Sequence, residues 1–174
     1  MGFVTVLALG LAVQAGRAPF VATPPDVVDR MLALAQVGAR DVVYDLGCGD
    51  GRIVIAAART YGARGVGVDI DPTRIDEARE NARLAGVEHL VTFRVEDART
   101  TDVSEATVVT LYLVSALNVQ LRPRLTAQLR PGARIVSHNF PMGDWEPNRV
   151  DVFRSADGQM RTLYLWNADG RTRP

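Results

Sequence analysis

Glycines and carboxylates gather where two apolar runs of the chain end. The loop Gly47-Cys48-Gly49-Asp50-Gly51 directly follows the run that ends at Leu46, and Asp69 closes the next run. Glycines let a backbone turn tightly and approach a ligand that a side chain would exclude. A carboxylate about eighteen residues beyond such a loop can accept hydrogen bonds from both hydroxyls of a ribose. The two features together predict a site for an adenosine nucleotide or nucleoside.

The spacing of the glycines and the acid before them narrow the choice of ligand. Dinucleotide enzymes carry Gly-x-Gly-x-x-Gly, where a helix N-terminus faces a pyrophosphate. Here the spacing is Gly-x-Gly-x-Gly, and Asp45 lies where its carboxylate suits an ammonium better than a pyrophosphate. S-adenosylmethionine has an ammonium, a sulfonium and a ribose, and it has no phosphate. The chain contains no lysine, which excludes a Walker-type phosphate loop. We therefore predict S-adenosylmethionine as the cofactor.

Composition limits the other classes of function. The chain has 174 residues, 20 basic and 20 acidic side chains, and one cysteine. That length fits one domain with a single core. A net charge of zero gives no general attraction to nucleic acid. Cys48 cannot form an internal disulfide, and no Cys/His cluster has zinc spacing, so we predict no metal site.

Apolar runs alternate with helical patterns along most of the chain. The predicted strands cover residues 41–46, 65–69, 90–95, 107–113 and 133–136, and the predicted helices cover residues 23–38, 52–61, 71–86 and 117–129. In the first helix we expect Thr23 as N-cap and Pro24 as the first helical residue. Near the end, residues 150–154 and 162–166 flank Asp157-Gly158, a turn signal for a hairpin. This order predicts an α/β, Rossmann-like, doubly wound and mostly parallel seven-strand sheet with a C-terminal antiparallel hairpin.

The chain divides into an apolar leader, residues 1–18, and a single domain, residues 19–174. Residues 3–13 are almost wholly apolar, too short a run for the roughly 20 residues of a spanning helix, and Val13-Gln14-Ala15 suits signal peptidase. Three interpretations stay open: a cleaved export signal, a short membrane tether, or a buried segment. S-adenosylmethionine is a cytosolic metabolite, so we favour a cytoplasmic domain, with membrane association through residues 3–13, over export through a cleaved signal peptide.

Four motifs together carry a family resemblance. Residues 45–51, residues 67–72, Glu96-Asp97 and residues 129–132 resemble the successive motifs of class I, seven-strand S-adenosylmethionine-dependent methyltransferases. The similarity runs from about Thr23 to Trp166. It implies the following contacts with the cofactor: Gly47 and Gly49 with the methionine part, Asp69 with the ribose, Asp97 with the adenine amino group, and Ile70 with the adenine ring.

A narrower resemblance concerns the methyl acceptor. Residues 20–24, Thr110-Leu111-Tyr112-Leu113 and the segment 140–147 are similar to the small archaeal protein-lysine methyltransferases. They are also similar to the mitochondrial enzymes that methylate the c-ring of ATP synthase and the adenine nucleotide carrier. The resemblance implies that Thr23 reaches the methionine end of the cofactor. The mitochondrial enzymes have a longer, membrane-embedded N-terminus, so their substrates do not carry over.

Aromatic residues after the fourth and fifth predicted strands are candidates for an acceptor channel. Tyr112 is the best candidate for a wall and hydrogen-bond partner, with packing alone as the alternative. His138 could accept the lysine proton or be structural. Trp145 could be a lid or a loop anchor. The further channel candidates are Phe20, Asn139, Phe140 and Trp145.

These features predict an enzyme that transfers a methyl group from S-adenosylmethionine to a protein lysine ε-amine. Residues 110–113 lack the Asn/Asp-Pro-Pro-Tyr motif of enzymes that methylate amide or base nitrogens. The expected partner is a protein with an accessible lysine, and no nucleic acid. The alternatives are a small-molecule methyltransferase and a non-catalytic S-adenosylmethionine-binding protein.

Overall fold

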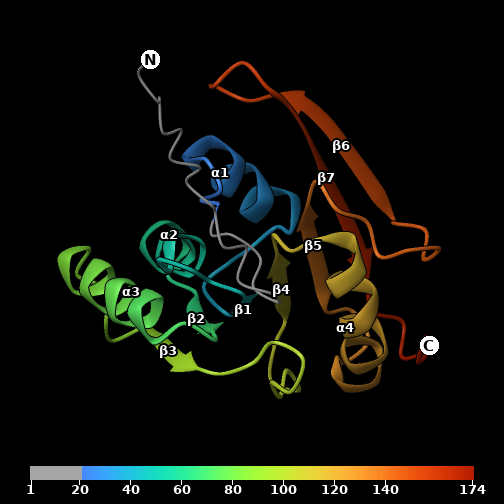
Figure 1. The fold of residues 1–174 in the computed structure, drawn as a ribbon, viewed down its shortest axis with the longest axis horizontal. Coiled ribbons are helices and arrows are strands. Elements are labelled where there is room, and N and C mark those ends of the chain that lie inside the picture. Colours follow the sequence, from blue (N-terminus) through green and yellow to red (C-terminus); the bar gives the residue numbers. More distant parts are fainter. Residues whose placement is uncertain (1–20) are drawn as a thin grey trace, which may run out of the picture.

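The computed structural model describes residues 21–174 (Figure 1). Strands and helices alternate up to the fifth strand, except that the third and fourth strands follow each other without a helix between them, as predicted. The helices are α1 (Pro25–Leu34), α2 (Arg52–Tyr61), α3 (Pro72–Leu84) and α4 (Ser115–Gln128). The strands are β1 (Val42–Leu46), β2 (Arg64–Asp69), β3 (Val91–Val95), β4 (Val108–Leu111), β5 (Arg134–His138), β6 (Arg149–Arg154) and β7 (Met160–Asn167).

The seven strands form one sheet in the order β3-β2-β1-β4-β5-β7-β6. β1 to β5 pair in parallel, and β7 is antiparallel to both of its neighbours. The predicted mostly parallel sheet with a C-terminal hairpin is therefore confirmed. The strand order reverses between β1 and β4: β2 and β3 follow on one side of β1, whereas β5 lies on the other side, next to β4. The carboxyl ends of these strands meet at one edge, which is where doubly wound sheets bind ligands.

Helices cover both faces of the sheet, as predicted. α1, α2 and α3 pack on one face, where small side chains such as Ala57 and Ala78 let α2 and α3 approach the strands closely. α4 lies on the other face, where Leu121 and Leu125 pack in a cluster that includes the fully buried Trp166. β1 and β4, at the centre of the sheet, are buried on both sides, which explains their continuous apolar runs.

The start of α1 differs from the prediction by one residue. The N-cap is Pro24, with φ −57° and ψ 148°, and Pro25 is the first helical residue. A residue that precedes proline is sterically disfavoured in the helical region, so Pro25 holds Pro24 in an extended conformation. Thr23 consequently makes no cap hydrogen bond and is available for another role.

Two polar contacts join α1 to the C-terminal hairpin. The Asp26 carboxylate accepts hydrogen bonds from the Ser155 hydroxyl and from the backbone N–H of Ala156, each at 2.8 Å. One turn later Arg30 donates two hydrogen bonds to Asp151, at 2.6 and 2.9 Å. The Asp26–Ser155 contact spans 129 residues of sequence. The hairpin therefore holds the helix that begins directly after residues 21–23.

The predicted apolar leader, residues 1–18, and its run at residues 3–13 lie outside the described residues. Within residues 21–174, no helix has both the length and the apolar character needed to cross a membrane.

Candidate functional site

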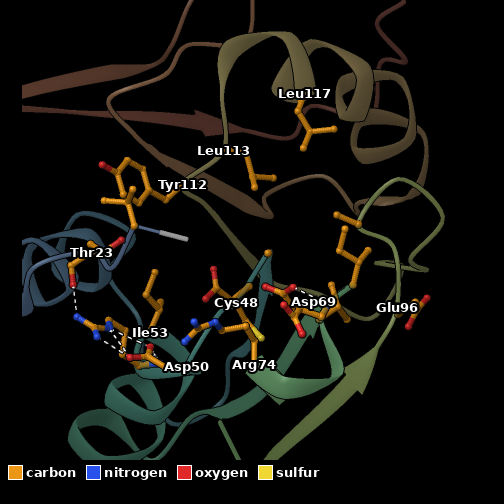
Figure 2. A pocket seen from close by; sticks show the side chains of 18 of the residues that line it. Thr23, Cys48, Asp50, Ile53, Asp69, Arg74, Glu96, Tyr112, Leu113 and Leu117 are labelled. Atoms are coloured by element: carbon orange, nitrogen blue, oxygen red, sulfur yellow. Dashed lines mark hydrogen bonds and ion pairs between the residues drawn. The ribbon is translucent and has the colours of Figure 1, made fainter. Parts of the chain in front are cut away.

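A cavity of about 420 Å³ opens at the carboxyl ends of β1, β2 and β4, beside the point where strand order reverses (Figure 2). Its volume falls within the roughly 300–1,000 Å³ of small-molecule sites. Tyr112 and Leu113 face the glycine loop and Asp69 across it. The lining residues that the sequence already singled out are Thr23, Asp45, Gly47, Asp69, Ile70, Glu96, Asp97 and Tyr112.

The glycines of the loop after β1 have different tasks. Gly47 lines the cavity at φ 80°, and a Cβ there would lie 2.8 Å from the Leu113 side chain. Gly51, at φ 78°, lies against Phe93, which a Cβ would meet at 2.7 Å. Gly49 does not line the cavity, and its backbone N–H donates a hydrogen bond to Asp69 at 3.0 Å. The three glycines therefore do different things: Gly47 leaves room at the cavity, Gly49 donates a hydrogen bond to Asp69, and Gly51 allows close packing against Phe93.

Asp69 is held with both carboxylate oxygens in place. Oδ2 accepts from Gly49 N–H, and Oδ1 accepts from the backbone N–H of Asp71 at 2.9 Å. Each carboxylate oxygen has a second lone pair. Asp69 can therefore accept two further hydrogen bonds from neighbouring hydroxyls, which is the geometry that a ribose requires.

Asp45 is a buried carboxylate at the wall of the cavity, with 3% of its surface exposed. It accepts a 2.7 Å hydrogen bond from the Thr110 hydroxyl, its partner in the β1–β4 register. Burial, together with the charges of Asp50 and Asp69 and against the Thr110 hydrogen bond, raises the pKa of Asp45 to about 7. A cationic group in the cavity would favour the ionised form. The carboxylates of Asp45 and Asp69 are acceptors that fit a ligand with both an ammonium and a ribose.

Ile70 and Asp97 line the cavity, and Figure 2 shows Glu96, the neighbour of Asp97 in the chain, on the opposite side of the view from Thr23. Ile70 keeps 48% of its surface exposed, so an aromatic ring can still pack on it. The Asp97 carboxylate accepts hydrogen bonds from the backbone N–H of Arg99 at 2.8 Å and from its guanidinium at 3.1 Å. These contacts with Arg99 hold the pKa of Asp97 below its usual range, so it is a hydrogen-bond acceptor at neutral pH.

Tyr112 lines the cavity directly after β4, and two aromatic side chains lie near its ring. The ring centroids of Tyr112 and His138 are 4.0 Å apart in a stacked arrangement, and Phe140 stacks at 6.1 Å. His138 is fully buried and does not line the cavity. Neither of its ring nitrogens has a hydrogen-bond partner in the part of the chain described. Burial lowers the pKa of His138 to about 4, so the ring is neutral at physiological pH.

The three other predicted channel residues that the structure describes do not line the cavity. Asn139, at φ 62°, accepts a hydrogen bond from Thr162 N–H at 3.0 Å and so ties the end of β5 to β7. Trp145 packs beside Trp166, whose indole N–H donates to the Trp145 carbonyl at 2.8 Å. Trp145 is therefore a loop anchor in this structure. Phe140 stacks on Tyr112 without lining the cavity, and Phe20 lies outside the described residues.

Several lining residues were not identified from the sequence. Asp50 and Arg52 form an ion pair at the start of α2, and Arg52 also donates to the Thr23 carbonyl at 2.9 Å. The sequence does place an acid and an arginine two residues apart at the end of the glycine loop, which could have indicated this ion pair. The others are Val21, Ala22, Ile53, Val68, Arg74, Ala98, Arg99, Leu113 and Leu117, and Cys48 and Asp71 line the cavity from within the two motifs described above.

Acidic side chains outnumber basic ones around the cavity. Among its described lining residues are six carboxylates and three arginines. The carboxylates are Asp45, Asp50, Asp69, Asp71, Glu96 and Asp97, and the arginines are Arg52, Arg74 and Arg99. This balance favours cationic ligands and disfavours a polyanion.

The comparisons with known proteins agree on a methyltransferase domain. Residues 45–149 match the ANTKMT methyltransferase domain family. The chain is 45% identical over 150 residues to a protein-lysine N-methyltransferase of Saccharolobus islandicus, covering 85% of this chain and 92% of that protein. It is 31% identical to the adenine nucleotide translocase lysine N-methyltransferase of Mus musculus over 77% of this chain, and spans 58% of that protein's length.

One solved structure with high similarity is named for RNA as its substrate, whereas the relatives above are named for protein lysine. It is an RNA methyltransferase from Salinibacter ruber in complex with S-adenosyl-L-homocysteine. The two chains are 54% identical with a TM-score of 0.82, and the match covers 88% of this chain and 97% of the other.

Proposed function

Because the chain belongs to the ANTKMT methyltransferase domain family, we propose that it transfers a methyl group from S-adenosylmethionine to the ε-amine of a protein lysine. The observation that carries the choice of acceptor is the 45% identity to the archaeal protein-lysine N-methyltransferase, which extends over 92% of that enzyme. We place the domain in the cytoplasm, where its methyl donor is made.

The cofactor, when bound, supplies a methyl group on a positively charged sulfur. The described residues suit its parts in order along the cavity. Asp69 has the free lone pairs for the ribose hydroxyls, and Asp45 offers a buried carboxylate to the ammonium. Gly49 acts on the ribose through Asp69, which it holds in place.

The two ends of the cavity suit the two ends of the cofactor. Gly47 and Thr23 lie beside the space for the methionine part. Ile70 and Asp97 flank the space for the adenine, which can stack on one and donate to the other.

Tyr112 is the side chain best placed to guide the acceptor. It lines the cavity at the end of β4, across from the glycine loop (Figure 2). A lysine must arrive as a neutral amine to attack the methyl carbon, and a narrow aromatic wall disfavours the charged ammonium. The chain's task is then to position the amine and exclude water. His138, behind Tyr112, supports the ring in this arrangement.

RNA is the second candidate acceptor, because the 54% identical Salinibacter ruber protein is called an RNA methyltransferase. The charges disfavour it, since the cavity carries a surplus of carboxylates that would repel phosphates. Residues 110–113, Thr-Leu-Tyr-Leu, also lack the motif of base-nitrogen methyltransferases.

A labelling experiment separates the acceptors. The enzyme and an Asp69→Ala control are incubated with methyl-labelled S-adenosylmethionine and a cell lysate, which is then divided for protease, RNase and small-molecule extraction. We expect label that protease releases, that RNase leaves in place, and that acid hydrolysis yields as methylated lysine. Label that RNase releases would replace protein by RNA as the acceptor. Label confined to the small-molecule extract would contradict both.

A further inference from the structure

Arg52 connects the glycine loop to the segment that precedes α1. Its Nη1 donates to the Thr23 carbonyl at 2.9 Å, while its Nε donates to the Asp50 carboxylate at 2.9 Å (Figure 2). We infer that Arg52, oriented by Asp50, is a positioning residue that holds residues 21–23 as a wall of the cofactor cavity and thereby limits the rate at which the cofactor leaves.

The wall depends on this contact. Val21, Ala22 and Thr23 all line the cavity, and Thr23 is only 4% exposed. Of the hydrogen bonds between described residues, the Arg52 contact alone reaches the backbone of residues 21–23. The next anchors along the chain are those of α1, which begins at Pro25. Loss of the Arg52 bond would therefore free the segment from the glycine loop without unfolding α1.

Contacts with α2 and α3 hold the Asp50–Arg52 ion pair in place. Arg52 is the first residue of α2, and the Asp50 carbonyl accepts a hydrogen bond from the Asn81 side chain of α3 at 3.0 Å. Burial alone would raise the pKa of the Asp50 carboxyl, yet its hydrogen bonds and charge contact with Arg52 hold that pKa below its usual range. A planar guanidinium can bind a carboxylate with one edge and a carbonyl with another nitrogen, which a lysine ammonium does less well.

The inference rests on the proposed function, because it concerns the same cofactor cavity. It has a direct rival: Arg52 lines the cavity, so it could bind the carboxylate of the cofactor itself. Asp50→Asn separates the two. If Arg52 acts by holding residues 21–23, Asp50→Asn leaves the guanidinium less well oriented and weakens cofactor binding. If Arg52 binds the ligand carboxylate, removal of the competing Asp50 charge strengthens binding.

The experiment measures S-adenosylhomocysteine binding and dissociation by calorimetry and stopped-flow fluorescence. The variants are Arg52→Gln, Arg52→Lys and Asp50→Asn. The control is Arg83→Gln, which breaks the exposed Arg83–Glu80 pair on α3, away from the cavity. Thermal unfolding without ligand checks that each variant folds. Loss of a hydrogen bond to a charged group predicts dissociation roughly ten- to a hundredfold faster for Arg52→Gln.

We expect faster dissociation for Arg52→Gln and Asp50→Asn, an intermediate rate for Arg52→Lys, and the wild-type rate for Arg83→Gln. At saturating S-adenosylmethionine the kcat of the Arg52 variants should stay near that of the wild type while KM rises. Wild-type dissociation rates in Arg52→Gln, or tighter binding by Asp50→Asn, would overturn the inference. Absence of binding by the wild-type protein would instead refute the proposed function.

Discussion

Replacing Asp45 with asparagine should stabilise the cofactor-free protein above pH 7 and weaken its binding of the cofactor. Asp45 is buried and accepts one hydrogen bond, from Thr110. Asparagine has nearly the same shape, and its side-chain oxygen can keep that bond. The substitution therefore removes the buried charge with little change in packing.

The pKa of Asp45 gives the magnitude and the sign. Burial raises the pKa from 3.8 to about 7 in the folded protein, so the folded state binds the proton more tightly than the unfolded chain does. Stability is then lost as the pH rises from about 4 to about 7, and the loss is complete above that range. At about 1.36 kcal/mol for each pKa unit, the raised pKa costs the wild type at most about 4 kcal/mol at pH 8. Asparagine does not titrate and avoids this cost.

Urea denaturation of both proteins without cofactor, at pH values from 4.5 to 8, tests the reasoning. Asp29→Asn, which removes an exposed carboxylate on α1, is the matched control. The gap in unfolding free energy between Asp45→Asn and the wild type should widen up to about pH 7 and then level off. In the same variant, loss of the partner to the ligand ammonium should weaken S-adenosylhomocysteine binding by about 2–5 kcal/mol. A gap that does not change with pH would refute the buried-charge argument, and unchanged binding would refute the ammonium assignment.

Three other substitutions, one of them with a matched control, test further parts of the site and its packing. Asp69→Asn should weaken S-adenosylhomocysteine binding about ten- to a hundredfold in calorimetry, because an amide nitrogen would face one of the N–H donors of Gly49 and Asp71; unchanged affinity would contradict the ribose assignment. Gly51→Ala should lower the unfolding free energy by about 2–4 kcal/mol, since its Cβ would lie 2.7 Å from Phe93. Gly86→Ala, with a similar positive φ and open space around it, should cost only about 1–2 kcal/mol, and equal losses would contradict the packing argument. His138→Phe should keep the stack on Tyr112 and the methyl transfer activity, and its unfolding free energy should lack the decrease that the wild type shows as the pH falls from 6.5 to about 4; intact cofactor binding without methyl transfer would assign the imidazole a part in the reaction.

The site was predictable wherever it depends on neighbouring parallel strands. The β1 loop and Asp69 each follow a strand immediately, and parallel strands bring their carboxyl ends to one edge. Their meeting at one cavity therefore follows from local sequence. The alternation of strands and helices was likewise readable from apolar spacing, and the hairpin from Asp157-Gly158.

The segment after β5 could not be predicted in the same way. Trp145 and Asn139 were expected in an acceptor channel, yet their positions follow from bonds to Trp166 and Thr162 on β7. Nothing near them in the sequence specifies those partners. The Arg52–Thr23 contact could not be predicted for the same reason, because it joins residues 29 positions apart through a backbone carbonyl.

The attachment of α1 to the C-terminal hairpin has a consequence for biosynthesis. Asp26 and Arg30 find their partners at Ser155 and Asp151, which are synthesised more than 120 residues later. Contacts so distant in sequence form late and slow the folding of a chain. A nascent chain cannot form these polar contacts of α1 until the hairpin has left the ribosome. A chain stopped before residue 149 would therefore lack both polar anchors of α1, although every glycine and carboxylate of the cofactor cavity would already have been translated.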